Sequence, residues 1–156
     1  MAQDQLDRID REILKVLQAD ARIPNVELAD RVGLSASPCA RRVQRLEARG
    51  VIARYATVIN QKAVGLPVSV FVNVTLERQV EGALETFETA VLKRPEVMEC
   101  YLMTGEADYL LRVVVADLDA YERFLIEHLT RVPGIANIRS SFALKQVAYR
   151  TELPLA

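Results

Sequence analysis

Residues 26–52 constrain the fold of this chain more than any other stretch of its sequence. Apolar residues recur at helical spacing on both sides of Gly33, which permits a sharp turn because glycine readily adopts a left-handed backbone. Ser35 is a good N-cap for the second helix, and Pro38 is tolerated in its first turn, where N–H groups have no intrahelical partner. Gly50 is a typical residue at a helix C-terminus. The pattern predicts two helices joined by a tight turn.

The second of these helices is rich in arginine. Residues 35–55 contain five arginines and one glutamate. On a helical wheel Cys39, Val43 and Leu46 share one face, which we expect to be buried, and polar residues occupy the opposite face. Arginine can bind guanine or phosphate in a forked geometry, and glutamine matches adenine. The side chains that we expect at a DNA interface are Ser35, Ser37, Pro38, Arg41, Arg42, Gln44, Arg45 and Arg49.

A solvated basic helix in a plain helical bundle would carry the same arginines. The preceding helix favours DNA binding, because Ala29 is small enough for a second helix to cross close by and Gly33 permits the bend. Whether Arg41 and Gln44 contact bases or phosphates stays open at this point. Arg54 and Tyr55 could contact the DNA backbone from a wing or could be ordinary strand-surface residues.

Composition excludes several classes of protein. The chain has 156 residues and a net charge of −1, so basic character is local rather than general. Cys39 and Cys100 lack metal-ligand spacing, which indicates buried free thiols in a reducing compartment and no metal site. No apolar run is long enough to cross a membrane, and the N-terminus lacks an apolar signal region. We expect a cytoplasmic protein.

The first sixty residues predict a small helical domain. Leu6, Ile9, Ile13, Val16 and Leu17 recur at helical spacing. The charged residues between them imply a solvated face, and they are Asp7, Arg8, Asp10, Arg11 and Glu12. A second helix over residues 25–32 and the arginine-rich helix follow. Residues 52–57 and 58–60 suggest two short strands of a wing. Residues 1–60 would thus form a winged helix-turn-helix domain, with residues 61–67 as a linker.

From residue 68 to residue 156 the pattern changes to alternating strands and helices. Strands are expected over residues 68–76, 97–104, 109–115 and 135–142, with a possible fifth over 144–149, and helices over residues 80–92 and 118–129. The order β-α-β-β-α-β is the ferredoxin-like arrangement, and the whole chain is of the α+β class. One sheet face would remain open, and a second copy of the chain is the simplest partner to cover it.

Motifs along nearly the whole chain, in order, resemble those of the Lrp/AsnC family of feast/famine regulators. In the first half they are residues 6–14, 20–22, 27–29, 33–35, 42–47 and 50–52. In the second half they are residues 95–97, 99–100, 104–105, 108–111, 133–135 and 153–154.

The resemblance implies a sequence-specific DNA-binding transcriptional regulator. Its N-terminal domain would bind double-stranded DNA, and its C-terminal domain would form homodimers through the sheets. Dimers would assemble into tetramers or octamers and would bind an amino acid between them, with no other cofactor.

The segment from Thr104 to Asp108 has two interpretations. From the residues alone it is a hairpin turn in which Gly105 adopts a special backbone angle and Asp108 caps the turn. Such a turn can also supply N–H groups for a carboxylate and oxygens for an ammonium group, and the resemblance implies this effector role. The expected effector site comprises Tyr101, Met103, Thr104, Gly105, Asp108, Ser140 and Ser141, the two serines from a facing subunit.

Apolar neighbours of this segment suggest an apolar effector such as leucine or methionine, whereas Glu106 would favour a basic amino acid. Two alternatives belong to other classes of function. An enzyme is not expected, because the single histidine, His128, has no evident nucleophile partner and no phosphate-binding loop is present. An architectural protein that wraps DNA without a small-molecule response is the alternative to the regulator.

Overall fold

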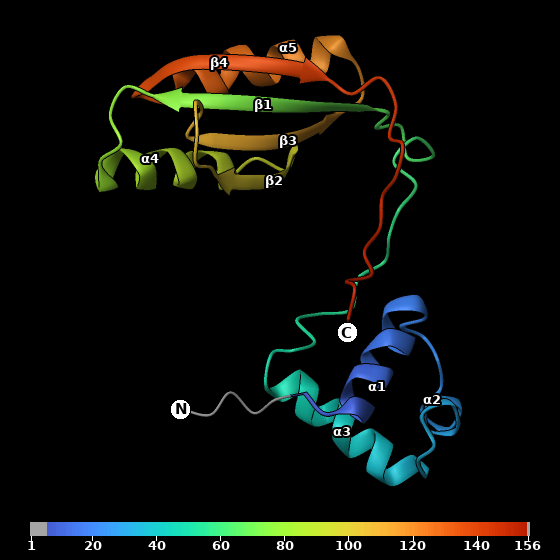
Figure 1. Cartoon of the computed structure of the whole chain (residues 1–156). Helices are drawn as coiled ribbons and strands as arrows, with labels where there is room; N and C mark the ends of the chain where they lie inside the picture. The colour runs from blue at the N-terminus through green and yellow to red at the C-terminus, as the bar shows by residue number, and fades with distance from the viewer. Residues whose placement is uncertain (1–5, 156) are drawn as a thin grey trace. The chain divides into compact units, whose positions relative to one another are not determined.

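A computed structural model describes residues 6–155 and divides them into two compact units, shown in Figure 1. The first unit contains residues 6–58 together with residues 147–155. The second contains Ile59–Gln146. The chain therefore passes from one unit to the other twice, once after residue 58 and once after residue 146. Each unit is described by itself.

The first unit is built on three helices, as the sequence predicts. They are α1 (Arg8–Ala19), α2 (Asn25–Val32) and α3 (Ala36–Ala48). Their shared core centres on Ile13, Leu28, Cys39 and Leu46, each at most 2% exposed. Burial also raises the pKa of the Cys39 thiol, so this cysteine is a packing residue. Cys100 is a free thiol as well, but it is only half-buried.

The first turn of α1 contains Asp10, a charged residue that we expected on the solvated face of the helix. Asp7 is the N-cap, and its carboxylate accepts a hydrogen bond of 2.8 Å from the backbone N–H of Asp10. Asp10 is only 1% exposed, so its assignment to a solvated face was wrong. Burial of a carboxylate requires charged partners, which α3 provides.

The expected wing strands do not form. Residues 53–60 contain no strand, and neither do residues 143–149, where a fifth strand was possible. All of these residues are exposed, and an extended segment becomes a strand only when a neighbouring strand pairs with its backbone groups. Tyr55 lies in this region and donates a 2.7 Å hydrogen bond to Glu47 of α3. Partial desolvation of its ring hydroxyl, followed by this carboxylate, raises the pKa of Tyr55 to about 12.

The C-terminal residues pack on the first unit, whereas the sequence analysis assigned residues 68–156 to the second domain. The side-chain amide of Gln18 in α1 accepts a 2.6 Å hydrogen bond from the backbone N–H of Leu153 and donates one of 3.2 Å to its carbonyl. Leu155 packs against the core of the three helices. We call residues 153–155 the C-terminal clasp.

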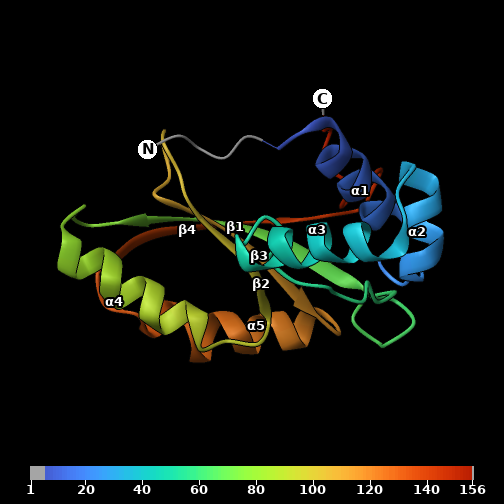
Figure 2. The ribbon, with the colours of Figure 1, turned by 90° about the horizontal axis from the view of Figure 1, so that it is seen from below.

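The second unit is a four-stranded antiparallel sheet with the strand order β2-β3-β1-β4. The strands are β1 (Val68–Leu76), β2 (Val97–Leu102), β3 (Tyr109–Val115) and β4 (Ile135–Phe142). The helices are α4 (Glu81–Leu92), α5 (Leu118–Glu127) and the short η1 (Leu129–Arg131). Figure 2 shows α4 and α5 on the same face of the sheet. This is the βαββαβ arrangement that the sequence predicts.

Alternation along the strands separates the two faces of this sheet. Val70, Val72 and Val74 of β1 are fully buried and pack with Leu111 of β3 and Phe87 of α4. The opposite face has no helix and is largely polar. Arg112 of this face donates to Glu99 of β2 at 3.2 Å and to Gln61 at 3.1 Å.

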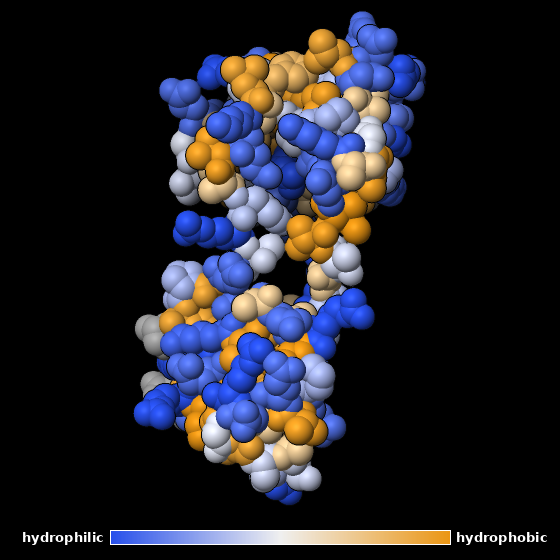
Figure 3. All heavy atoms as spheres, turned by 90° about the vertical axis from the view of Figure 1, so that its right-hand side faces the viewer, coloured by the Kyte–Doolittle hydropathy of each residue, from blue (hydrophilic) through white to orange (hydrophobic). Residues whose placement is uncertain are grey.

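Hydrophilic and hydrophobic side chains are mixed over the face of the molecule shown in Figure 3. In the described part of the chain, no helix has the length and apolar character to cross a membrane. Among the same residues, no group of three or more His, Cys, Asp and Glu side chains is arranged to hold a metal ion.

Candidate DNA-binding helix and effector hairpin

The turn between α2 and α3 depends on the backbone of Gly33. This residue has a φ of 70° and a ψ of 37°, in the left-handed region. The N–H of Leu34 then donates to the carbonyl of Ala29 at 2.8 Å, which closes the end of α2. The side chain of Asn25 donates to the carbonyl of Ala36 at 2.8 Å and joins the start of α2 to the start of α3. These contacts fix the direction in which α3 leaves the turn.

The start of α3 differs in one detail from the prediction. Ser35 occupies the N-cap position with an extended backbone, but its hydroxyl makes no capping hydrogen bond. Ser35 and Ser37 are both exposed, and Pro38 is half-buried. The first-turn N–H groups of α3 therefore have no side-chain cap from Ser35, and such groups can bind a phosphate oxygen.

The exposed face of α3 contains most of the residues expected at DNA. Arg41, Gln44 and Arg45 are exposed, whereas Arg42 and Arg49 are half-buried. The opposite face contributes Cys39 and Leu46 to the core, both 0% exposed. The wheel drawn from the sequence thus separates the buried side of α3 from its polar side correctly.

Arg42 and Arg45 of α3 make ion pairs with residues near the start of α1. Arg42 donates from Nη1 to Asp7 at 2.6 Å and to the buried Asp10 at 2.7 Å. Arg45 lies 3.2 Å from the second oxygen of Asp10. The backbone N–H of Asp10 and then the Arg42 guanidinium hold the pKa of Asp7 below its ordinary value. Arg42 therefore attaches α3 to α1.

The second candidate region is the hairpin between β2 and β3. Gly105 has a φ of 127°, and Thr104 and Gly105 are exposed. Asp108, by contrast, is only 5% exposed. Its carboxylate accepts hydrogen bonds from the backbone N–H of Leu76 at 2.6 Å and from the amide of Gln79 at 2.5 Å. Asp108 thus caps the end of β1 as well as closing its own turn.

The remaining effector candidates lie on opposite edges of the sheet. Tyr101 and Met103, 51% and 44% exposed, belong to the β2 side, whereas Ser140 and Ser141 belong to β4. Three strand spacings, about 14 Å, separate these edges. Ser140 also shares a hydrogen bond with the hydroxyl of Tyr121 in α5, which places it on the helix side. One protomer therefore does not bring these residues to a single small ligand.

Two partners of the candidate residues were missed by sequence reasoning. Gln79 follows β1 and contacts Asp108, and Asp10 receives Arg42 and Arg45. Neither residue belongs to a local motif. Polar side chains at a strand end and in a helix normally contact solvent, and only the three-dimensional packing reveals their partners.

Comparison with known proteins assigns both units. Residues 6–53 match the winged helix-turn-helix DNA-binding family, and residues 69–153 match the Lrp/AsnC ligand binding domain. The chain is 48% identical over 151 residues to the Bkd operon transcriptional regulator of Pseudomonas aeruginosa, covering 97% of this chain and 99% of that protein. It is 45% identical over 148 residues to the leucine-responsive regulatory protein of Escherichia coli K12, covering 95% and 90%. The chain belongs to the Lrp/AsnC family.

Solved structures of this family share the fold. A transcriptional regulator from Neisseria meningitidis in complex with L-Met has a TM-score of 0.92 and 41% identity, and the match covers 97% of both chains. An AsnC family regulator from Agrobacterium tumefaciens has a TM-score of 0.91 and 42% identity, covering 96% and 97%. This Lrp/AsnC chain is a DNA-binding transcriptional regulator with a ligand-binding domain, and it is not an enzyme.

Proposed function

We propose that this regulator recognises specific DNA sites with α3 and responds to an amino acid bound at the hairpin of its second unit. The observation that supports the DNA-binding part of the proposal is that neighbouring arginines of α3 differ in their contacts within the unit. Arg42 is engaged by Asp7 and Asp10. Arg41 makes no ion pair with the residues that the structure describes and is exposed, so it can contact DNA without a change in the unit.

In this proposal α3 enters the major groove, as the second helix of a helix-turn-helix does. Arg41 and Gln44 would face the bases or the phosphates beside them, while Ser35, Ser37 and Pro38 would lie at a phosphate near the helix start. Arg45 and Arg49 would contribute at the flanks. Two copies of α3 in a dimer would contact successive major grooves of a near-palindromic site. A protein that binds DNA in this way works where the DNA is, so we place it in the cytoplasm.

The experiment that tests the DNA part compares Arg41→Ala with the wild-type protein by fluorescence anisotropy on a selected site and on random DNA. If Arg41 contacts a base, the variant loses ~1–3 kcal/mol on the selected site only. An equal loss on both DNAs with a shallower salt dependence assigns Arg41 to a phosphate. Wild-type protein that binds both DNAs equally at fixed salt contradicts sequence-specific recognition and favours an architectural protein that wraps DNA.

The effector part of the proposal places an apolar amino acid near the exposed turn at Thr104 and Gly105. Two relatives support an apolar ligand: the Escherichia coli protein is named leucine-responsive, and the Neisseria meningitidis regulator was solved with L-Met. Tyr101 and Met103 would supply apolar surface beside the turn. Asp108 would act mainly by holding the turn in place, because its carboxylate already accepts two hydrogen bonds inside the unit.

A second protomer would complete this site. Because β2 and β4 are opposite edges of the sheet, Ser140 and Ser141 can join Tyr101 only if they come from another copy. We propose homodimers through the helix-free sheet face, and tetramers or octamers of such dimers with ligand sites between them. An amino acid that binds between dimers would change their assembly, and by linkage DNA of the right spacing would change the affinity for the amino acid.

The test of the effector part is light scattering on the full-length protein, titrated with each of the twenty amino acids. The expected result is a mass of several dimers that shifts with leucine, methionine or another apolar amino acid. A mass that stays constant with all of them contradicts an effector that acts on assembly. A shift with lysine or arginine alone would overturn the apolar assignment and would point to Glu106 instead.

A further inference from the structure

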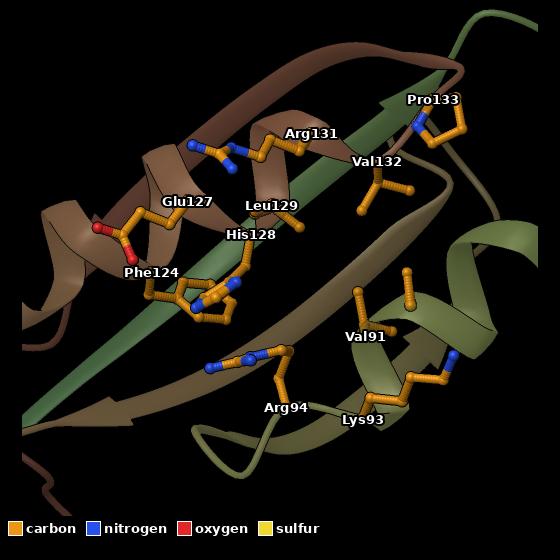
Figure 4. A pocket seen from close by; sticks show the side chains of 11 residues that line it. Val91, Lys93, Arg94, Phe124, Glu127, His128, Leu129, Arg131, Val132 and Pro133 are labelled. Carbon is orange, nitrogen blue, oxygen red and sulfur yellow. The ribbon is translucent and has the colours of Figure 1, made fainter.

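A pocket of about 350 Å³ lies between the C-terminal ends of α4 and α5, and it contains no residue of the effector hairpin. Figure 4 shows its lining, with Lys93 and Arg94 from the end of α4 and His128 and Arg131 from the end of α5 and η1. This volume falls within the range of small-molecule sites, about 300–1,000 Å³. The pocket can therefore hold a compact organic molecule.

The floor of the pocket is apolar and rigid. Val91, Phe124 and Leu129 line it, and each is at most 2% exposed because each also belongs to the core beneath the sheet. Val132 completes this surface beside Leu129. Such a floor favours the apolar body of a ligand, and its core residues hold the shape of the pocket before a ligand arrives.

The rim of the pocket is cationic. Lys93, Arg94 and Arg131 line it, and Glu127 is the one carboxylate among the lining residues. Cations are favourable near helix C-termini in any protein, which accounts for part of this charge. Two helices end here, and the cations that follow both of them line the same cavity.

The guanidinium of Arg94 has an unused donor. Its Nη2 donates to Glu96 at 3.0 Å, but its Nε is buried and has no hydrogen-bond partner among the described residues. Buried polar groups in folded proteins are nearly always paired, and Oε2 of Glu96 is buried without a partner as well, so the Arg94–Glu96 ion pair leaves one donor and one acceptor unsatisfied. Helix dipoles do not explain the unpaired Nε. A carboxylate would satisfy it with a charge-assisted hydrogen bond.

We propose that this pocket is a second ligand site, which takes a small organic carboxylate with an apolar body. The carboxylate lies at Arg94, Arg131 adds positive charge to the rim, and the apolar body lies on Phe124, Val91 and Leu129. This site does not depend on the amino-acid site proposed above. It would give the regulator a response to a metabolite acid that is separate from its response to an amino acid.

Saturation-transfer NMR on the full-length protein tests this site, with 3-phenylpropanoate as the probe and 3-phenylpropanamide as its uncharged control. The acid is expected to bind saturably, and the amide is expected to bind at least about tenfold more weakly because it lacks the charge. Saturable binding of both with equal affinity, or of neither, overturns the proposal.

Variants locate the probe within the chain. Arg131→Gln and Arg94→Lys are expected to weaken binding of the acid by about tenfold, and Ala90→Phe to abolish it by filling the cavity. Arg123→Gln is the matched control, because Arg123 is exposed on α5, the helix that ends beside the pocket, but does not line the pocket. Acid binding that is unchanged in Arg131→Gln and Ala90→Phe, both folded by circular dichroism, places the probe elsewhere and contradicts the proposal.

Discussion

Nη1 of Arg42 in α3 lies 2.7 Å from Oδ1 of Asp10 in α1, and Asp10 is 1% exposed. The pair therefore joins the candidate recognition helix to the first helix through a charge that solvent does not reach. A buried carboxylate without a partner is strongly unfavourable, so the geometry of α3 depends on this contact. Arg42 and its neighbour Arg41 have the same chemistry but different roles.

Replacing Arg42 by alanine is expected to destabilise the first unit without removing an exposed DNA contact. Breaking a buried pair from one side costs ~3–5 kcal/mol, and we expect the lower end of this range because Arg45 still contacts Asp10. Urea unfolding followed by circular dichroism measures the loss. Arg41→Ala is the matched control and is expected to stay within ~0.5 kcal/mol of the wild type. Equal stability of the two variants would contradict the structural role of Arg42.

Acid is expected to weaken the N-terminus of α1 through Asp7. The folded-state pKa of Asp7 is lowered, so its stabilising contribution is complete above the unfolded-state pKa of about 3.9 and is lost as the pH falls through the folded value. Asparagine also caps helices but does not titrate in this range. The stability advantage of the wild type over Asp7→Asn, measured by urea unfolding at several pH values, is expected to decline below about pH 4 and to disappear once the pH is below the folded-state pKa. An advantage that does not change with pH would show that the charge of Asp7 is not responsible.

The helices and strands could be predicted from sequence because each has a periodic apolar face. The strand expected over residues 68–76 is β1, in which Val70, Val72 and Val74 are buried, and α2 has the predicted bounds. The wing strands could not be predicted correctly, since residues 53–60 have β-forming side chains but no strand beside them. The C-terminal clasp was missed because its contact with Gln18 joins residues 135 positions apart.

Prediction of the candidate sites was limited in the same way, because the partners of the site residues are far from them in the sequence. The wheel from Cys39 identified the exposed Arg41 and Gln44, but Arg42 was assigned to the DNA interface without knowledge of Asp10. Charge and helical spacing determine which side of a helix is polar. They do not determine which polar residues on that side find a partner inside the protein.

Asp108 is expected to matter for stability as well as for the effector. Asp108→Ala removes the acceptor of two hydrogen bonds and leaves the N–H of Leu76 without this partner, so we expect a loss of ~1–3 kcal/mol. Asp108→Asn keeps one acceptor oxygen and is expected to lose less. Gln79→Ala, which removes only the second hydrogen bond, is the control. Thermal unfolding ranks the three variants by stability. If Asp108→Ala is as stable as Gln79→Ala, the capping role of Asp108 is contradicted.

The same substitutions separate the two interpretations of the hairpin. If Asp108 only holds the turn, the folded Asp108→Asn variant keeps its response to amino acids in light scattering. If its carboxylate also binds the ammonium group of the ligand, the response weakens although the variant remains folded. We expect the first result, because both carboxylate oxygens of Asp108 already accept hydrogen bonds within the unit.

The C-terminal clasp is expected to stabilise the DNA-binding unit rather than the sheet unit, which ends at Gln146. Removing residues 152–156 eliminates both hydrogen bonds of Gln18 to Leu153 and the packing of Leu155, with an expected loss of ~1–3 kcal/mol. Gln18→Ala is expected to reproduce part of this loss. Lys15→Ala, at an exposed ion pair of the same helix, is expected to change stability by less than ~1 kcal/mol. Hydrogen exchange measures the effect locally: amides of α1 are expected to exchange faster in the truncated protein, while amides of β1 and β3 stay protected. Unchanged protection of α1 would mean that the clasp does not stabilise this helix.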